Sequence, residues 1–186
     1  GSDAVASVTA ASKISMFIVC PFDSMGATMA TYGGQNAGGY KLDRLHKGLG
    51  SCIILGAVYS VIGLLIIAAF GPHLLKLFVS GSETGILADA QHFLLINGLF
   101  YFPLALVNIV RFMIQGMGFG FFAIIAGVLE MAARTLVGAV FVPIFGYNAA
   151  CFASPLAWIF ADCFLIPAYF VVWNRMKRHK EAYRQV

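Results

Sequence analysis

The chain has 186 residues, of which 60% are hydrophobic and only 11% are charged, and its formal net charge is +4. An average soluble domain is about 25% charged, so this composition excludes an ordinary soluble fold and indicates an α-helical membrane protein. The basic residues gather beside apolar runs, where they act as topology signals and contacts to anionic lipid rather than as a nucleic-acid surface.

Five apolar runs are each long enough to cross a hydrocarbon core of about 30 Å as a helix. We expect spans at about residues 4–32, 49–70, 88–115, 119–145 and 149–173, within a transmembrane bundle of residues 1–174, and a basic cytoplasmic tail at residues 175–186. The runs are too long and too uniformly apolar for the alternating strands of a membrane barrel. The sequence therefore predicts an all-α, polytopic bundle of five spans.

Glycine and proline mark the expected ends of these spans. After the first span, residues 33–48 read GGQNAGGYKLDRLHKG, a glycine-rich break followed by a basic cluster. Gly71 and Pro72 are expected to end the second span. Glycines form a tight turn between the third and fourth spans, and a proline and a glycine close the fourth; these are Gly116, Gly118, Gly120, Pro143 and Gly146.

Prolines also lie inside the spans, at Pro21, Pro103, Pro155 and Pro167. Each removes a backbone hydrogen bond and can kink its helix. Pro21, two residues before the carboxylate of Asp23, is either an ordinary bend or a hinge near a substrate path.

Five spans place the loop after the first span, the turn after the third and the C-terminus on one side. That side holds Lys41, Arg44 and Lys47 together with the basic C-terminal residues, so the positive-inside rule makes it cytoplasmic. The N-terminus then lies outside. We therefore expect at least one further span before Gly1, in a larger transporter-like protein.

No enzyme motif of the kinds GxSxG, HExxH or Walker A occurs in the sequence, and we expect no enzymatic activity. The four cysteines form no CxxC pair and fall in or beside apolar runs. Their arrangement is typical of small buried side chains and implies neither a disulfide framework nor a metal site.

Ionisable residues inside spans are the informative ones, since a charge at the bilayer centre costs at least about 2.5–3.5 kcal/mol and needs a partner or a wet cavity. Glu130 and Arg134 are four apart and can pair, either as a structural lock or as a relay or gate. Arg111 either snorkels to the interface or reaches Glu130. Asp162 is either a neutral acid bonded to a neighbour or part of a polar cavity, and Asp23 is similar but nearer the cytoplasmic side.

Several motifs together resemble the multidrug and toxic compound extrusion (MATE) transporters. Gly34, Gln35, Asn36 and Gly38 match the Gly-Gln-Asn-x-Gly motif that ends the second and eighth helices of that family. Residues 115–118 (QGMG) resemble the turn after its tenth helix, Glu130 and Arg134 a recurring pair in its eleventh, and residues 154–162 (SPLAWIFAD) the start of its twelfth. The order of these motifs implies family helices eight to twelve, one lobe of an inverted-V transporter.

The resemblance implies a multi-pass protein of the cytoplasmic membrane with a cytoplasmic C-terminus. It would belong to an antiporter that exports drugs or amphipathic organic cations and is driven by protons or sodium, with no other cofactor. Its implied partners are membrane lipid, a missing N-terminal lobe and the organic cation, but no nucleic acid. The candidates for coupling or gating are Glu130, Arg134, Asp162, Asp23 and Arg111.

Sodium-coupled members of the family carry acidic residues in helices seven and ten. The third span here has no carboxylate between Asp89 and Arg111, which leaves open a coupling site outside this chain. A lipid-linked oligosaccharide flippase of the same superfamily is one alternative, although Lys13 and Arg134 are few cations for its cavity. A membrane structural subunit without transport activity is another.

Overall fold

All regular secondary structure in the described part of the chain is helical. The structure, a computed structural model, describes residues 2–79 and 83–183, except the side chains of residues 2 and 179–183. The elements are α1 (Ser2–Gly38), α2 (Leu42–Leu75), α3 (Thr84–Leu99), α4 (Tyr101–Gly116), α5 (Gly120–Leu136), the π-helix η1 (Val137–Phe141), α6 (Val142–Phe145) and α7 (Tyr147–Tyr183). The predicted all-α, polytopic bundle is confirmed.

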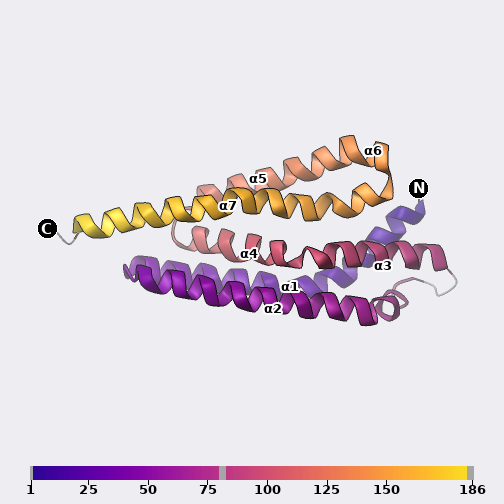
Figure 1. Ribbon diagram of the computed structural model, residues 1–186, viewed down its shortest axis with the longest axis horizontal. Helices are drawn as coiled ribbons and strands as arrows, with labels where there is room; N and C mark the ends of the chain where they lie inside the picture. The colour runs from indigo at the N-terminus through magenta and orange to yellow at the C-terminus, as the bar shows by residue number, and fades with distance from the viewer. Residues whose placement is uncertain (1, 80–82, 184–186) are drawn as a thin grey trace.

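Helix α4 is the centre of the bundle. It contacts α1 and α2 on one side and α5 and α7 on the other, and Figure 1 shows it between these two pairs. The α1–α2 turn, the α4–α5 turn and the C-terminus lie at one end of the molecule, and the N-terminus and the α6–α7 turn lie at the other. We call the first end the basic end, because it carries Lys41, Arg44, Lys47, Arg175, Lys177 and Arg178.

Four helical segments in the described residues are long and apolar enough to cross a membrane, namely α1, α2, residues 120–145 and α7. The pair α3 and α4 passes the same test together but is bent by 52°, so it makes a fifth span if it counts as one. Helix α7 runs on to Tyr183, so the expected basic tail is helical as far as that residue.

The bend between α3 and α4 lies at Phe100, three residues before Pro103. A straight helix would need the missing N–H of Pro103 to reach the carbonyl of Leu99, against which the proline ring would also clash. The helix therefore breaks there, and the continuous span expected over residues 88–115 is a bent pair. Pro21, Pro155 and Pro167 lie inside α1 and α7, both of which remain helical throughout.

Two other proline sites behave differently from expectation. The predicted end of the second span at Gly71 and Pro72 is wrong, because α2 continues to Leu75. Leu75 is fully buried, and Nε2 of Gln91 on α3 donates to the carbonyl of Ile67 at 3.2 Å, so tertiary contacts hold the helix past the proline. Just before Pro143 the helix widens into η1, the kind of local insertion that often accompanies a break in the regular bonding.

Helix α1 continues past Tyr32, where we expected it to end, because its glycines pack against α4. A Cβ atom on Gly33 would lie 3.0 Å from the carbonyl oxygen of Met113, and one on Gly34 would lie 3.1 Å from that of Gly116. A Cβ atom on Gly116 would overlap the carbonyl oxygen of Ala30. Small residues let two membrane helices approach backbone to backbone, and this contact joins α1 to the central helix.

We expect Gly116→Ala to lower the free energy of unfolding by about 1–3 kcal/mol, since the added methyl meets backbone that cannot turn away. Gly127→Ala is the matched control, because nothing lies within 4 Å of its Cβ position in α5. The control should leave stability unchanged or raise it by up to about 1 kcal/mol. Denaturant unfolding of the solubilised protein measures both, and equal effects would contradict the close contact.

Candidate functional site

Glu130 on α5 is a buried carboxylate that binds two arginines. Its side chain is 10% exposed, Nη2 of Arg111 donates to Oε1, and Nη2 of Arg134 donates to Oε2 at 2.9 Å. Glu130 lies about 15 Å along the helix axis from Gly120, at the rise of a regular helix. A carboxylate inside a membrane-spanning helix is costly unless it is paired, and both partners of this one are cations of the protein itself.

The two arginines reach Glu130 from different helices. Arg134 is one turn further along α5 and its side chain is 42% exposed, whereas Arg111 comes from α4 and is 20% exposed. Of the two placements that the sequence left open for Arg111, the structure has the one that reaches Glu130. The Arg111–Glu130 pair therefore ties α5 to the central helix, and the Glu130–Arg134 pair expected from their spacing is present.

Asp162 on α7 brings a second carboxylate to the same place. It is buried, and its Oδ1 atom has no hydrogen-bond partner among the described residues. Nε of Arg111 is also buried without a partner. Arg111 is the charged group that acts electrostatically on Asp162, although no hydrogen bond joins them. We call Arg111, Glu130, Arg134 and Asp162 the charge cluster; it holds two cations and two carboxylates from three helices.

Asp23 lies outside the charge cluster, on the exposed side of α1, and makes no hydrogen bond or ion pair with the described residues. Lys13 is exposed on the same helix but points to the opposite end, where its Nζ atom lies 5.6 Å from the centroid of the Phe78 ring beyond α2. The sequence candidates thus divide into a buried group between α4, α5 and α7 and a separate carboxylate on α1.

The exposed side of α1 is polar, unlike that of its neighbour α2. From Thr9 to Gln35 its exposed polar residues lie one to seven positions apart, with exposed Met16 and Phe17 among them, and are Thr9, Lys13, Cys20, Asp23, Ser24, Thr28, Thr31 and Gln35. Ser24, Thr28 and Thr31 donate to carbonyls of their own helix, so these hydroxyls bind no other helix. By contrast the exposed side of α2 carries Ile54, Leu55, Val58, Val61, Ile62 and Leu65. Lipid suits the second surface, and water or a polar protein surface suits the first.

The glycine motif after the first predicted span ends α1 in a Schellman turn. The backbone N–H of Tyr40 donates to Ala37 at 3.0 Å, and that of Lys41 donates to Asn36 at 2.8 Å. Tyr40 holds the left-handed position of this turn, with φ at 51°, where glycine is the usual residue. The side-chain amide of Asn36 donates to the carbonyl of Tyr32 at 2.9 Å and reinforces the last turn of the helix.

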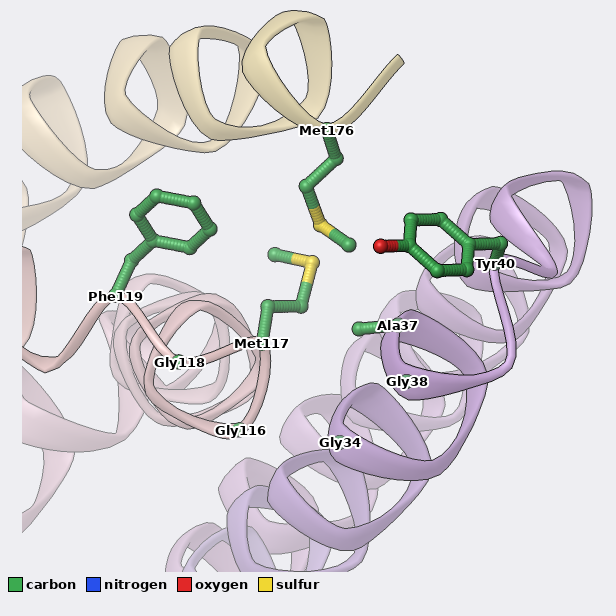
Figure 2. Close-up of a pocket in the computed structure, with 9 residues that line it drawn as sticks. All are labelled: Gly34, Ala37, Gly38, Tyr40, Gly116, Met117, Gly118, Phe119 and Met176. Atoms are coloured by element: carbon green, nitrogen blue, oxygen red, sulfur yellow. The ribbon is translucent and has the colours of Figure 1, made fainter. Parts of the chain in front are cut away.

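The second glycine motif ends α4 in the same way. The N–H groups of Gly118 and Phe119 donate to Gln115 and Ile114 at 3.0 and 3.2 Å, and Gly118 has φ at 92°. Figure 2 shows the two turns on either side of one pocket of about 390 Å³ at the basic end, into which Tyr40, Met117 and Met176 converge. The two motifs are thus helix ends that meet in space.

Comparison with known proteins now identifies the family. A family model described as MatE matches residues 1–144, from α1 into α6. The chain belongs to the MatE family. The match supports a multi-pass membrane transporter of this family, and the resemblance inferred from the motifs is confirmed. Asp162 lies beyond the matched residues. Neither the curated proteins nor the solved structures give a significant match.

Sequence reasoning missed two features of this MatE chain. The proximity of Asp162 to Arg111 depends on how α7 packs, and no local sequence pattern predicts it. The polar side of α1 does leave a signal in the sequence, because polar residues recur on one face of an otherwise apolar span. Considering Asp23 alone, without these neighbours, missed that signal.

Glu130→Ala should destabilise the protein more than Arg134→Ala. Removing Glu130 leaves two cations without their partner and costs about 3–5 kcal/mol, as for other broken buried pairs. Arg134→Ala leaves Glu130 paired with Arg111, so no buried charge loses its only partner and the cost should be smaller. Unfolding in denaturing detergent measures both variants, and the opposite ranking would show that Glu130 is not the centre of the cluster.

Proposed function

We propose that this MatE chain is one lobe of a cation-coupled secondary antiporter, which exports amphipathic organic cations or drugs across the cytoplasmic membrane. The observation that carries the proposal is the exposed carboxylate of Asp23 in the polar side of α1. The basic end is then cytoplasmic, following the positive-inside rule.

Asp23 lies about 22 Å along α1 from Gly38, too deep for a charged carboxylate to face lipid at low cost. A polar surface at this depth belongs beside a water-filled path, and a second lobe would form the other wall of that path. The exposed side of α2 is apolar and suits contact with lipid, which supports placing the polar side of α1 away from lipid. We therefore place the transport path along α1.

The same surface suits an amphipathic cation. Met16 and Phe17 lie about two turns from Asp23 and are 73% and 78% exposed, so apolar contact and negative charge share one helix face. Aromatic and thioether side chains bind organic cations of varied shape. A carboxylate can hold a proton, a sodium ion or the substrate cation in turn, and this competition is the physical basis of antiport. An oligosaccharide flippase would need cations here, yet Arg134 is held by Glu130 and Lys13 lies beside Phe78.

Transport by the complete protein in proteoliposomes tests the proposal. A proton or sodium gradient should drive uptake of a fluorescent organic cation, and Asp23→Asn should reduce the uptake by about tenfold, the equivalent of about 1.4 kcal/mol of lost interaction. Asp43→Asn, an exposed carboxylate of the basic end, is the matched control and should transport normally. Gradient-independent uptake, or equal rates for both variants, would contradict the proposal.

Two native cysteines test the polar side of α1 directly. Cys20 lies beside Asp23, whereas Cys163 on α7 is equally classed as exposed but sits among Phe160, Ile166 and Phe170. A thiolate, which forms in water and not in lipid, attacks the sulfur of a charged, water-soluble methanethiosulfonate and displaces methanesulfinate. We expect single-cysteine variants to react at Cys20 and not at Cys163, with substrate slowing the reaction. Equal labelling of the two positions would place both in the same environment and refute the aqueous path.

A further inference from the structure

Only some of the polar atoms in the charge cluster have hydrogen-bond partners. Both carboxylate oxygens of Glu130 accept hydrogen bonds, but Arg111 uses only its Nη2 atom for this, and its buried Nε atom is free. Oδ1 of Asp162 is buried and equally free, and Asp162 is 7% exposed. The donor on Arg111 and the acceptor on Asp162 are both buried on neighbouring helices and have no partner among the described residues, which marks a contact that can form but is unmade in this state.

Among the charged groups around Asp162, Arg111 is the one available to pair with it. Helix α4 brings Arg111, and α5 brings Glu130 and Arg134, which bind each other. The charged and titratable groups that α2 and α3 bring to α7 lie towards its ends, where His46 contacts Tyr169 and Trp173, and Asp89 lies beside Tyr147. The segments η1 and α6 contain no ionisable residue.

We propose that Asp162 is a proton-binding site of this lobe, and that Arg111 senses its charge by exchanging between Glu130 and Asp162. With the proton bound, Asp162 is neutral and Arg111 stays on Glu130. When Asp162 releases the proton to water, its carboxylate attracts the Nε edge of Arg111, which remains protonated throughout. The exchange would draw α7 towards α4 and loosen α5, so one proton would move helices within the lobe. This inference rests on the proposed cation-coupled transport and names a residue that binds the coupling ion.

Trp158 offers a local reporter of this change. It is buried and lies four residues before Asp162 on α7, so the two share a helix face. Trp173→Phe leaves Trp158 as the only indole of these 186 residues, and the signal of Trp158 in the complete protein is the part that a further Trp158→Phe change removes. In this background, Trp158 fluorescence of the protein in nanodiscs should follow pH with one midpoint, and Asp162→Asn should abolish the response. The infrared band of a protonated carboxyl should disappear in the same variant.

Substitutions at the other cluster positions should move the midpoint in opposite directions. Glu130→Gln frees Arg111 to pair with Asp162. The midpoint of the fluorescence titration should then shift to lower pH by about one unit or more, as for a carboxylate that gains a nearby cation. Arg134→Gln leaves Arg111 as the only partner of Glu130, which keeps Arg111 from Asp162. The midpoint should then shift to higher pH. In an Arg111→Gln, Glu130→Gln background, Arg134→Gln should have no effect, since its influence passes through the two missing groups. Asp43→Asn, at an exposed carboxylate of the basic end, is the control without a shift.

The outcomes separate this inference from the proposed function. A fluorescence response that survives Asp162→Asn, or the absence of both the response and the infrared band, overturns the proton site whatever the transport assay gives. Shifts of the same sign for Glu130→Gln and Arg134→Gln overturn the exchange of Arg111. Conversely, a titration that behaves as expected in a protein without gradient-driven uptake supports the proton site and contradicts antiport. Circular dichroism confirms that each variant is folded.

Discussion

A carboxylate inside a lipid-embedded helix has to find its cations within the protein, and Glu130 does so by holding one arginine from its own helix and one from α4. This constraint determines which helices can neighbour each other. Helix α5 has to lie with Glu130 towards the central helix, and α7 then closes over Arg111 with Asp162. The pairing of α4 with α5 also fixes the short turn between them, whose glycines end one helix before the next begins.

The other half of the bundle depends on shape rather than charge. Gly33, Gly34 and Gly116 bring α1 and α4 into backbone contact, where no ion pair is present among the described residues. Helix α4 therefore binds one neighbour by close packing and the other by a buried charge. A glycine contact tolerates little movement, because packed backbones have no alternative fit, whereas an arginine between two carboxylates has two arrangements. The mobile part of this bundle is thus expected on the side of α5 and α7.

Much of the fold could be predicted from the sequence, because long apolar runs in a bilayer form helices. A kink near Pro103 could also be expected, because proline has no N–H to continue the hydrogen bonding of its helix. The pair Glu130–Arg134 followed from a spacing of four. Other features depend on tertiary contacts. Helix α2 passes Pro72 because Gln91 and buried Leu75 hold it, and α1 passes Tyr32 because its glycines are packing surfaces. Asp162 is 51 residues beyond Arg111 in the numbering, and only the packing of α7 brings them together.

The ion pair between Arg111 and Glu130 is the contact that holds α5 to the central helix, and a double-mutant cycle measures its strength directly. The free energies of unfolding of Arg111→Gln, Glu130→Gln and the double variant give the coupling energy of the pair. We predict a favourable coupling above about 1 kcal/mol, with the double variant more stable than the sum of the single losses allows. Losses that add to within about 0.3 kcal/mol would mean that α4 and α5 are held together without this pair, and would contradict the account.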